Sequence, residues 1–259
     1  MRHPNETRFQ DFFVHDYYVT LKNYLYNYRV RKSVIGRAMA AETPRLILEV
    51  GSGLSPIVTD RDRIVYSDLA YEGVVHLRRL HGRGHYVVAD CTKLPFRDNA
   101  FSHAVCSEVL EHVENDGDAL AELSRVLDAE GQLYLTFPHG RFYFWNDDRF
   151  AGHFRRYSLD DMLNKLTVGG LRPVEIRKVL GPLEKLTMSA CVFAIDVSRL
   201  FSATRNGAAS PPGRPPSRFV VAAFKWSNAV HGALCKVDAK LFPRAMAAVL
   251  FIRAEHCRR

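Results

Sequence analysis

Acidic side chains near the ends of short apolar runs are the residues of this chain best suited to chemistry. Glu49, Asp68 and Asp90 each lie at or near the end of such a run. An ionised carboxylate only accepts hydrogen bonds, and an acid at the end of a second strand can accept two of them from ribose hydroxyls. Gly51 and Gly53 follow the first run, where they let the backbone turn sharply and approach a ligand. These residues predict a small-molecule site, and the alternative for the two aspartates is that they are solvated loop acids.

The glycine spacing differs from that of a dinucleotide-binding fingerprint. The third glycine of that fingerprint would fall at position 56, which is Pro56. NAD and FAD are therefore disfavoured, and an ordinary strand and turn remains the alternative for this motif. Only a short segment separates Gly53 from Ile64. A first crossover there is expected to be very short or irregular, because parallel strands normally need about a dozen linking residues.

Apolar runs alternate with helical periodicity along most of the chain. The runs predict strands at 46–50, 64–68, 86–90, 104–108, 133–137, 171–176 and 247–252. Between them, Leu120, Leu123, Val126 and Leu127 recur at helical spacing, and Gly131 follows as a stop. This alternation predicts an α/β fold, with a doubly wound parallel sheet covered by helices on both faces. The polar residues at several strand ends place a site along the carboxyl edge of that sheet.

Taken together, these motifs resemble the class I S-adenosylmethionine-dependent methyltransferases, and within them the type 11 group. The resemblance covers about residues 46–180, and its motifs are residues 49–53, Asp68, residues 89–96 and residues 107–113. It implies a Rossmann-like, seven-stranded sheet whose last strand is antiparallel. It also implies S-adenosylmethionine as the cofactor and S-adenosylhomocysteine as the product, and the ribose diol and exocyclic amine of this cofactor suit carboxylate acceptors.

The resemblance also implies which residues bind the cofactor. The first loop would surround the methionine part, Asp68 the ribose hydroxyls and Asp90 the adenine amino group, with Ser107 and Glu108 beneath the sulfonium. The full set is Glu49, Gly51, Ser52, Gly53, Asp68, Leu69, Asp90, Cys91, Ser107 and Glu108.

Residues 138–157 begin at the active edge and are rich in aromatic and basic side chains. His139 is the first candidate general base, because an imidazole titrates near neutral pH and can remove a proton from an acceptor hydroxyl. The alternative is an ordinary loop or core histidine. The candidate substrate-binding residues, which resemble a segment of type 11 relatives, are His153, Arg155, Arg156 and Tyr157. The two arginines could clamp a phosphate or carboxylate, or simply lie at the surface.

A metal site is not predicted. Glu108 and His112 are four residues apart, with Glu111 between them, so they could share one helix face. No other ligand set in the sequence supports such a site, and packing of His112 beside the cofactor is the preferred interpretation.

The composition is that of a globular enzyme. The chain has 259 residues, of which 47% are hydrophobic, enough for one full core with an addition. Its five cysteines are scattered and lack CxxC spacing, which argues against a disulfide framework and favours a reducing cytosol. Arg2, Glu6 and Arg8 precede any apolar run, so no secretory signal is expected. We therefore expect a cytoplasmic protein, with peripheral contact to a membrane as a possibility.

The formal net charge of +8 is unevenly distributed over four expected segments. They are an aromatic helical arm at 1–45, the cofactor-binding core at 46–181, a helical insert at 182–245 between strands six and seven, and the last strand and tail at 246–259. The core is acidic, with 16 Lys and Arg against 20 Asp and Glu, whereas the insert has nine against three. A basic surface suggests an anionic partner, and solvated surface charge is the alternative.

The insert contains two apolar helix candidates, at 184–201 and 219–236, joined by a Gly-, Ser- and Pro-rich linker at 206–217. Charged residues such as Asp196 and Lys225 interrupt both, so neither can span a bilayer. The region 184–236 can instead lie at a membrane interface and meet a lipid-linked acceptor. A cap on the sheet or a dimer contact is the alternative, and the oligomeric state is left open.

The aromatic arm has Tyr24 and Tyr28 at helical spacing, which favours simple packing. The resemblance implies that such an arm packs over the cofactor cleft, and stacking on RNA bases is the less favoured alternative. The chain is thus predicted to move a methyl group to a small or lipid-linked acceptor, with oxygen as the favoured atom. The rivals are an RNA methyltransferase and a non-catalytic binding or scaffold protein on the same fold. Base N-methylation is disfavoured, because Phe137-Pro138-His139 poorly matches the Asn/Asp-Pro-Pro-Tyr/Phe motif.

Overall fold

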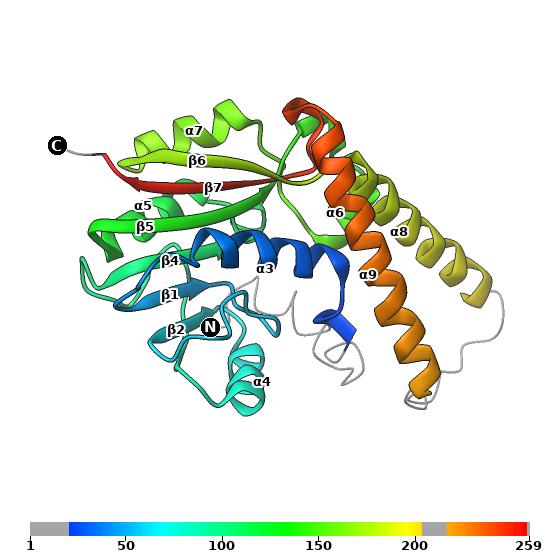
Figure 1. Ribbon diagram of the computed structural model, residues 1–259, viewed down its shortest axis with the longest axis horizontal. Coiled ribbons are helices and arrows are strands. Elements are labelled where there is room, and N and C mark those ends of the chain that lie inside the picture. Colours follow the sequence, from blue (N-terminus) through cyan, green and yellow to red (C-terminus); the bar gives the residue numbers. More distant parts are fainter. Residues whose placement is uncertain (1–20, 204–216, 258–259) are drawn as a thin grey trace.

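One mixed sheet of seven strands forms the centre of the molecule (Figure 1). The computed structural model describes residues 21–203 and 217–257. The strands are β1 (Ile47–Val50), β2 (Ile64–Asp68), β3 (His85–Val88), β4 (Phe101–Ser107), β5 (Leu127–Pro138), β6 (Leu171–Leu180) and β7 (Val249–His256). Their order is β3-β2-β1-β4-β5-β7-β6, and β7 is antiparallel to both β5 and β6. The predicted seven-stranded sheet with an antiparallel last strand is confirmed.

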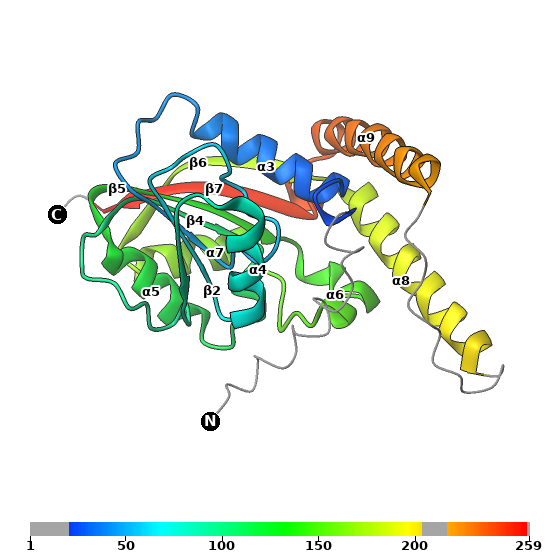
Figure 2. The ribbon, with the colours of Figure 1, turned by 90° about the horizontal axis from the view of Figure 1, so that it is seen from below.

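Helices cover both faces of the sheet (Figure 2). They are α3 (Tyr26–Ala38), α4 (Tyr71–His81), α5 (Asp116–Val126), α6 (Asn146–Ala151), α7 (Leu159–Val168), α8 (Pro182–Ala203) and α9 (Arg218–Leu241). Short 3-10 turns add η2 (Leu110–His112), η3 (Arg141–Tyr143) and η4 (Arg244–Met246). The doubly wound arrangement predicted from alternating strands and helices is therefore present in this part of the chain.

The core has two halves because consecutive strand residues point to opposite faces. Leu48 belongs to the half that α5 and α7 cover, and Leu120 of α5 is part of the same cluster. Ile47 belongs to the other half, which contains Ile35 of α3 and Leu77 of α4. The central strands β1, β2 and β4 are buried along nearly their whole length, which explains why they read in the sequence as nearly continuous apolar runs.

Some element boundaries differ from those expected. α5 ends at Val126, and Leu127, which the helical periodicity had included, begins β5. β4 starts at Phe101, three positions before the predicted strand. Residues 51–63 contain no helix, as expected for a crossover of that length.

The insert between β6 and β7 consists of two long helices that lie beyond the end of the sheet (Figure 1). α9 packs beside α3, where the backbone N–H of Tyr26 donates to Asn228 Oδ1 at 3.1 Å. Among the described helices, none combines the length and apolar character that crossing a membrane requires. The predicted linker at 206–217 and the first part of the aromatic arm lie almost entirely outside the described residues.

Candidate functional site

The loop after β1 is organised by Glu49. This side chain is 2% exposed, and its two carboxylate oxygens accept hydrogen bonds from the backbone N–H groups of Ile57 (2.6 Å) and Val58 (2.9 Å). Burial raises the pKa of Glu49 to about 7, although these two hydrogen bonds act in the opposite direction. Glu49 thus holds the irregular crossover in place, and its predicted contact with the cofactor stays a prediction.

Gly51 and Gly53 both have left-handed backbone conformations, with φ of 65° and 50°. A Cβ on Gly51 would clash with Cγ2 of Val109, so the loop packs tightly there. Around Gly53 the space is more open. Among the described residues, only Lys22 Nζ at 3.7 Å and Asp68 Oδ2 at 3.9 Å come within 4 Å of where a Cβ would be. The second glycine therefore faces a cradle bounded by an amine and a carboxylate.

Asp68 ties the end of β2 to this glycine loop. Its Oδ2 accepts from Gly53 N at 2.8 Å and its Oδ1 from Ala70 N at 2.9 Å. Burial raises the pKa of Asp68, while the backbone donors and the nearby Lys22 ammonium hold it down. Burial in turn lowers the pKa of Lys22. Sequence reasoning missed Lys22, because nothing in the arm's aromatic pattern relates it to a loop far along the chain.

Asp90 and Cys91 lie after β3, next to Asp68: the N–H of Ala89 donates to the Asp68 carbonyl at 3.0 Å. Asp90 Oδ1 accepts from both the backbone N–H and the hydroxyl of Thr92, each at 2.8 Å. Burial and the Asp90 carboxylate raise the pKa of the Cys91 thiol to about 12. The thiol is therefore protonated near neutral pH and is not a competing nucleophile.

The end of β4 brings two further predicted residues to the same edge. The hydroxyls of Ser107 and Thr136 are hydrogen-bonded at 2.9 Å. Glu108 has a positive φ of 56°, which is strained for a residue with a side chain and is typical of functional sites. Its Oε2 lies 3.2 Å from Nη1 of Arg31, which reaches over from α3. Arg31 was not among the candidates found from the sequence.

His139 is 6% exposed and follows β5 directly. Its Nδ1 lies 2.8 Å from the carbonyl oxygen of Ala247, which can only accept, so Nδ1 carries the proton and donates. The lone pair of the neutral ring is therefore on Nε2. Burial lowers the pKa of His139, so the ring is neutral at pH 7. This is the protonation state that a general base requires.

The basic segment after α6 is largely engaged within the fold. The Arg156 guanidinium donates to Asp148 Oδ1 at 2.7 Å and to the His139 carbonyl at 3.2 Å, and it is buried. The hydroxyl of Tyr157, also buried, donates to Asp116 Oδ2 at 2.8 Å. These contacts give both residues a structural role, and their predicted role in substrate binding stays a prediction.

The other two residues of this segment are more accessible. Arg155 is 31% exposed in its side chain and pairs with Asp116 at 3.0 Å. Nδ1 of His153 lies 2.7 Å from Asp148 Oδ1 and the side chain is 13% exposed. The predicted role of Arg155 and His153 in substrate binding stays a prediction.

A fully buried carboxylate lies next to His153 and was not selected as a site residue from the sequence. Glu111 is 0% exposed, and neither of its carboxylate oxygens has a hydrogen-bond partner among the described residues. Burial and the nearby Glu108 carboxylate raise the pKa of Glu111 well above its usual range. Glu111 is distinguished by its burial and not by its residue type, and a sequence motif does not show whether a side chain is buried.

Comparison with known proteins agrees with this geometry. Residues 48–135 match the model of a family described as a methyltransferase domain. An uncharacterized protein of Methanocaldococcus jannaschii is 33% identical over 93 residues, which are 35% of this chain and 40% of that protein. The match thus spans less than half of that relative's length.

Several solved structures share the fold. An S-adenosylmethionine-dependent methyltransferase of Thermotoga maritima has a TM-score of 0.59 at 14% identity, covering 99% of this chain and all of that one. The [4+2]-cyclase SpnF has a TM-score of 0.54 at 18% identity, covering 87% of this chain and 80% of that one. The YcgJ protein of Bacillus subtilis has a TM-score of 0.52 at 13% identity, with 87% and 95% covered. At these identities the similarity establishes the fold alone.

The fold and the acids at its carboxyl edge define a Rossmann-like methyltransferase domain. The family match over 48–135 and the sheet topology both agree with a class I, S-adenosylmethionine-dependent methyltransferase. The site fits that cofactor. The backbone at Gly53 leaves room for the cofactor, and the amine of Lys22 beside it suits the carboxylate of the methionine part. The carboxylates of Asp68 and Asp90 suit the ribose hydroxyls and the adenine amino group as donors.

Proposed function

We propose that this protein transfers the methyl group of S-adenosylmethionine to an oxygen atom of a small or lipid-linked acceptor. The observation that carries the choice of oxygen is the tautomer of His139, whose Nδ1–H is used by the Ala247 carbonyl. A hydroxyl must lose its proton as it becomes methylated, and the lone pair on Nε2 is available to take it. His139 lies at the carboxyl end of β5, on the edge that also carries Asp68 and Glu108.

The cofactor supplies an activated methyl group on a sulfonium, and the chain's contribution is largely positional. Asp68 and Asp90 orient donors of the cofactor, and the backbone at Gly53 leaves the approach open. The protonated thiol of Cys91 does not compete as a nucleophile. His139 accepts the acceptor's proton at Nε2 while its Nδ1–H stays on the Ala247 carbonyl.

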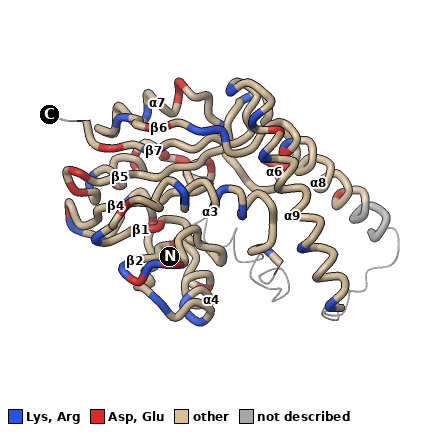
Figure 3. The backbone as a smooth tube through the Cα atoms, in the orientation of Figure 1, with Lys and Arg blue, Asp and Glu red and all other residues tan. Residues whose placement is uncertain are grey.

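A lipid-linked acceptor is supported by the outer surface of α9. This helix exposes an apolar stripe at helical spacing, formed by Phe219, Trp226, Val230, Leu234, Val237 and Leu241. Phe219 is 83% and Trp226 72% exposed. Lys236 and Lys240 on the same helix are exposed. Figure 3 shows basic positions spread along α9. An apolar face bordered by basic residues suits a helix that lies in the interface of an anionic bilayer.

The reaction can be tested with tritium-labelled methyl donor and three separate acceptor pools: lipid extract, aqueous metabolites and total RNA from the cells that produce the protein. The proposal predicts label in the lipid or aqueous pool, on a product that keeps it as an O-methyl group. Label confined to RNA would favour the rival enzyme class. Cofactor binding without transfer to any pool would favour a non-catalytic role.

Membrane contact is tested separately by sedimentation with vesicles of phosphatidylcholine, with and without phosphatidylglycerol. We expect binding to the anionic vesicles that is lost in Trp226→Ser but kept in Val168→Ser, a matched change of a residue that is 83% exposed on α7. Equal binding of both variants would remove the support for a lipid-linked acceptor.

A further inference from the structure

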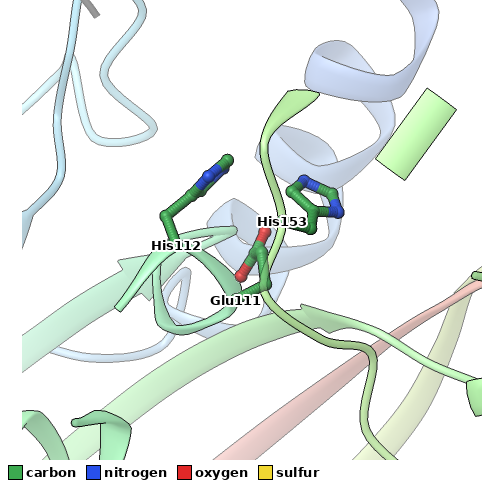
Figure 4. Close-up of side chains that lie close together, drawn as sticks. All are labelled: Glu111, His112 and His153. Carbon is green, nitrogen blue, oxygen red and sulfur yellow. The ribbon is translucent and has the colours of Figure 1, made fainter. Parts of the chain in front are cut away.

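Three side chains with metal-binding atoms converge beside the carboxyl edge of the sheet (Figure 4). Glu111 and His112 come from the η2 turn, and His153 comes from the segment after α6. One donor atom of each lies within 4.8 Å of the other two. The two imidazole rings are 4.7 Å apart between centroids and meet edge to face at 78°.

The backbone holds these two segments together. The N–H of Phe154 donates to the carbonyl of Glu111 at 2.8 Å, which joins the segment containing His153 directly to η2. The N–H of His153 donates to the carbonyl of Asp148 at 2.9 Å. The convergence is therefore built by main-chain contacts and does not depend on side-chain rotamers alone.

His153 is oriented for metal binding. Its Nδ1 donates to Asp148 Oδ1 at 2.7 Å, which leaves the lone pair on Nε2. Asp148 is itself held by Arg156 Nε at 2.7 Å and by the buried ammonium of Lys185. A carboxylate that orients a histidine from its far nitrogen is the usual arrangement around metal-binding histidines.

Glu111 provides the independent evidence for a missing ligand. Its carboxylate is 0% exposed, and neither oxygen has a hydrogen-bond partner among the described residues. Oε1 of Glu108, close by, is likewise buried without one. A buried carboxylate with no donor is costly, and the cost is removed when it binds a cation.

We propose that Glu111, His112 and His153 bind one divalent transition-metal ion, with Zn²⁺ as the best match. Two imidazoles and one carboxylate form a ligand set typical of catalytic zinc and of related first-row ions, and a poor one for Mg²⁺. Metal–ligand bonds of about 2.0–2.2 Å separate tetrahedral ligands by roughly 3.4 Å, so side-chain movements on the order of 1 Å complete the site.

Three protein ligands leave at least one coordination position open. Arg156 links this cluster to His139, because it donates both to Asp148, which orients His153, and to the His139 carbonyl. The open position would hold an oxygen of the acceptor. This last step rests on the proposed function, whereas binding of the metal itself does not.

The experiment uses the full chain, free of any affinity tag and stripped of metal by chelator, titrated with Zn²⁺ in a calorimeter. The variants are Glu111→Gln, which keeps the side chain's shape, and His153→Ala. His85→Ala, an exposed histidine on β3, is the matched control. Each site variant should bind Zn²⁺ at least tenfold more weakly than wild type, about 1.4 kcal/mol, and the control should not change.

Titration with Co²⁺, followed by its visible absorption, reports whether nitrogen ligands are bound, and this absorption should disappear in His153→Ala. Should that variant unfold in a thermal melt, Glu111→Gln still decides the question. Absence of Zn²⁺ binding by wild type, or equal binding by all four proteins, overturns the proposal. Calorimetry with S-adenosylmethionine on the metal-free protein separates this failure from failure of the proposed function.

Discussion

Lys185 at the start of α8 and Asp148 of α6 form an ion pair in which neither side chain is exposed to solvent. The same ammonium contacts Asp147, and the second oxygen of Asp148 holds both His153 and Arg156. A buried charge network therefore connects the helical insert to the carboxyl edge of the sheet. The first turn of the insert is part of the structure that positions the site, whatever its outer surface binds.

Replacement of Lys185 by methionine tests this network. The variant leaves Asp147 and Asp148 buried without their ammonium partner, and breaking such a pair typically costs about 3–5 kcal/mol. Urea denaturation should show this loss in the free energy of unfolding. Lys236→Met on the exposed side of α9 is the control and should change it by less than about 0.5 kcal/mol. A loss below about 1 kcal/mol in Lys185→Met would contradict the network's role.

Stability should fall as pH rises from 5 to 8, in part because of Glu49. The pKa of Glu49 is raised from 4.5 to about 7, so the folded protein binds a proton more tightly than the unfolded chain does. The contribution of the protonated Glu49 to the free energy of unfolding is fully present below pH 4.5 and is lost as pH rises through about 7. Between these two limits the free energy of unfolding should fall by about 3 kcal/mol because of Glu49.

Glu49→Gln removes this titration, so its free energy of unfolding should change less between pH 5 and 8 than that of wild type. Glu130→Gln, an exposed glutamate on β5, should retain the wild-type dependence. Identical pH dependences for wild type and Glu49→Gln would show that Glu49 does not titrate in this range.

Lys22 is expected to contribute to cofactor affinity. Its ammonium lies beside the Gly53 cradle, where it suits the carboxylate of the methionine part. Lys22→Met should weaken binding of S-adenosylmethionine by three- to tenfold, roughly 0.7–1.4 kcal/mol, in calorimetry. Lys236→Met, remote from the cradle, should bind as wild type does. Unchanged affinity in Lys22→Met would mean that the amine only pairs with Asp68.

His139 is expected to govern the rate and not the cofactor affinity. His139→Asn should lower kcat by about 10²–10⁴-fold once an acceptor is known, because general-base assistance is lost. Its binding of S-adenosylmethionine should stay as in wild type. Since burial lowers the pKa of His139 from 6.5, the acid limb of the wild-type pH profile should lie below 6.5, with activity rising as the ring loses its proton. An active His139→Asn with an unaltered profile would rule out this base.

The sequence predicted the sheet well because its central strands β1, β2 and β4 are buried on both faces, and an acid lies at or just after the end of several strands. The glycine loop, Asp68 and Asp90 could be ordered along one edge from strand alternation alone. The boundary between α5 and β5 was misplaced because Leu127 fits both the helical repeat and a strand.

Contacts between distant segments could not be predicted. Arg156 and Tyr157 resemble substrate-binding residues in sequence, but the fold buries them and uses their polar atoms internally. The prediction that no metal is bound considered only Glu108, Glu111 and His112. His153 was not considered, because only the fold of the loop after α6 brings it next to Glu111 and His112. Residue type shows which chemistry is available, whereas burial and proximity show where it is used.

The central claim is a cofactor site built around Asp68, and calorimetric titration of S-adenosylmethionine tests it most directly. Wild type should bind in the micromolar range, and Asp68→Ala should bind at least tenfold more weakly, about 1.4 kcal/mol. Asp62→Ala, whose side chain is 84% exposed, should bind as wild type does. No binding by wild type, or equal binding by wild type and Asp68→Ala, would contradict the account.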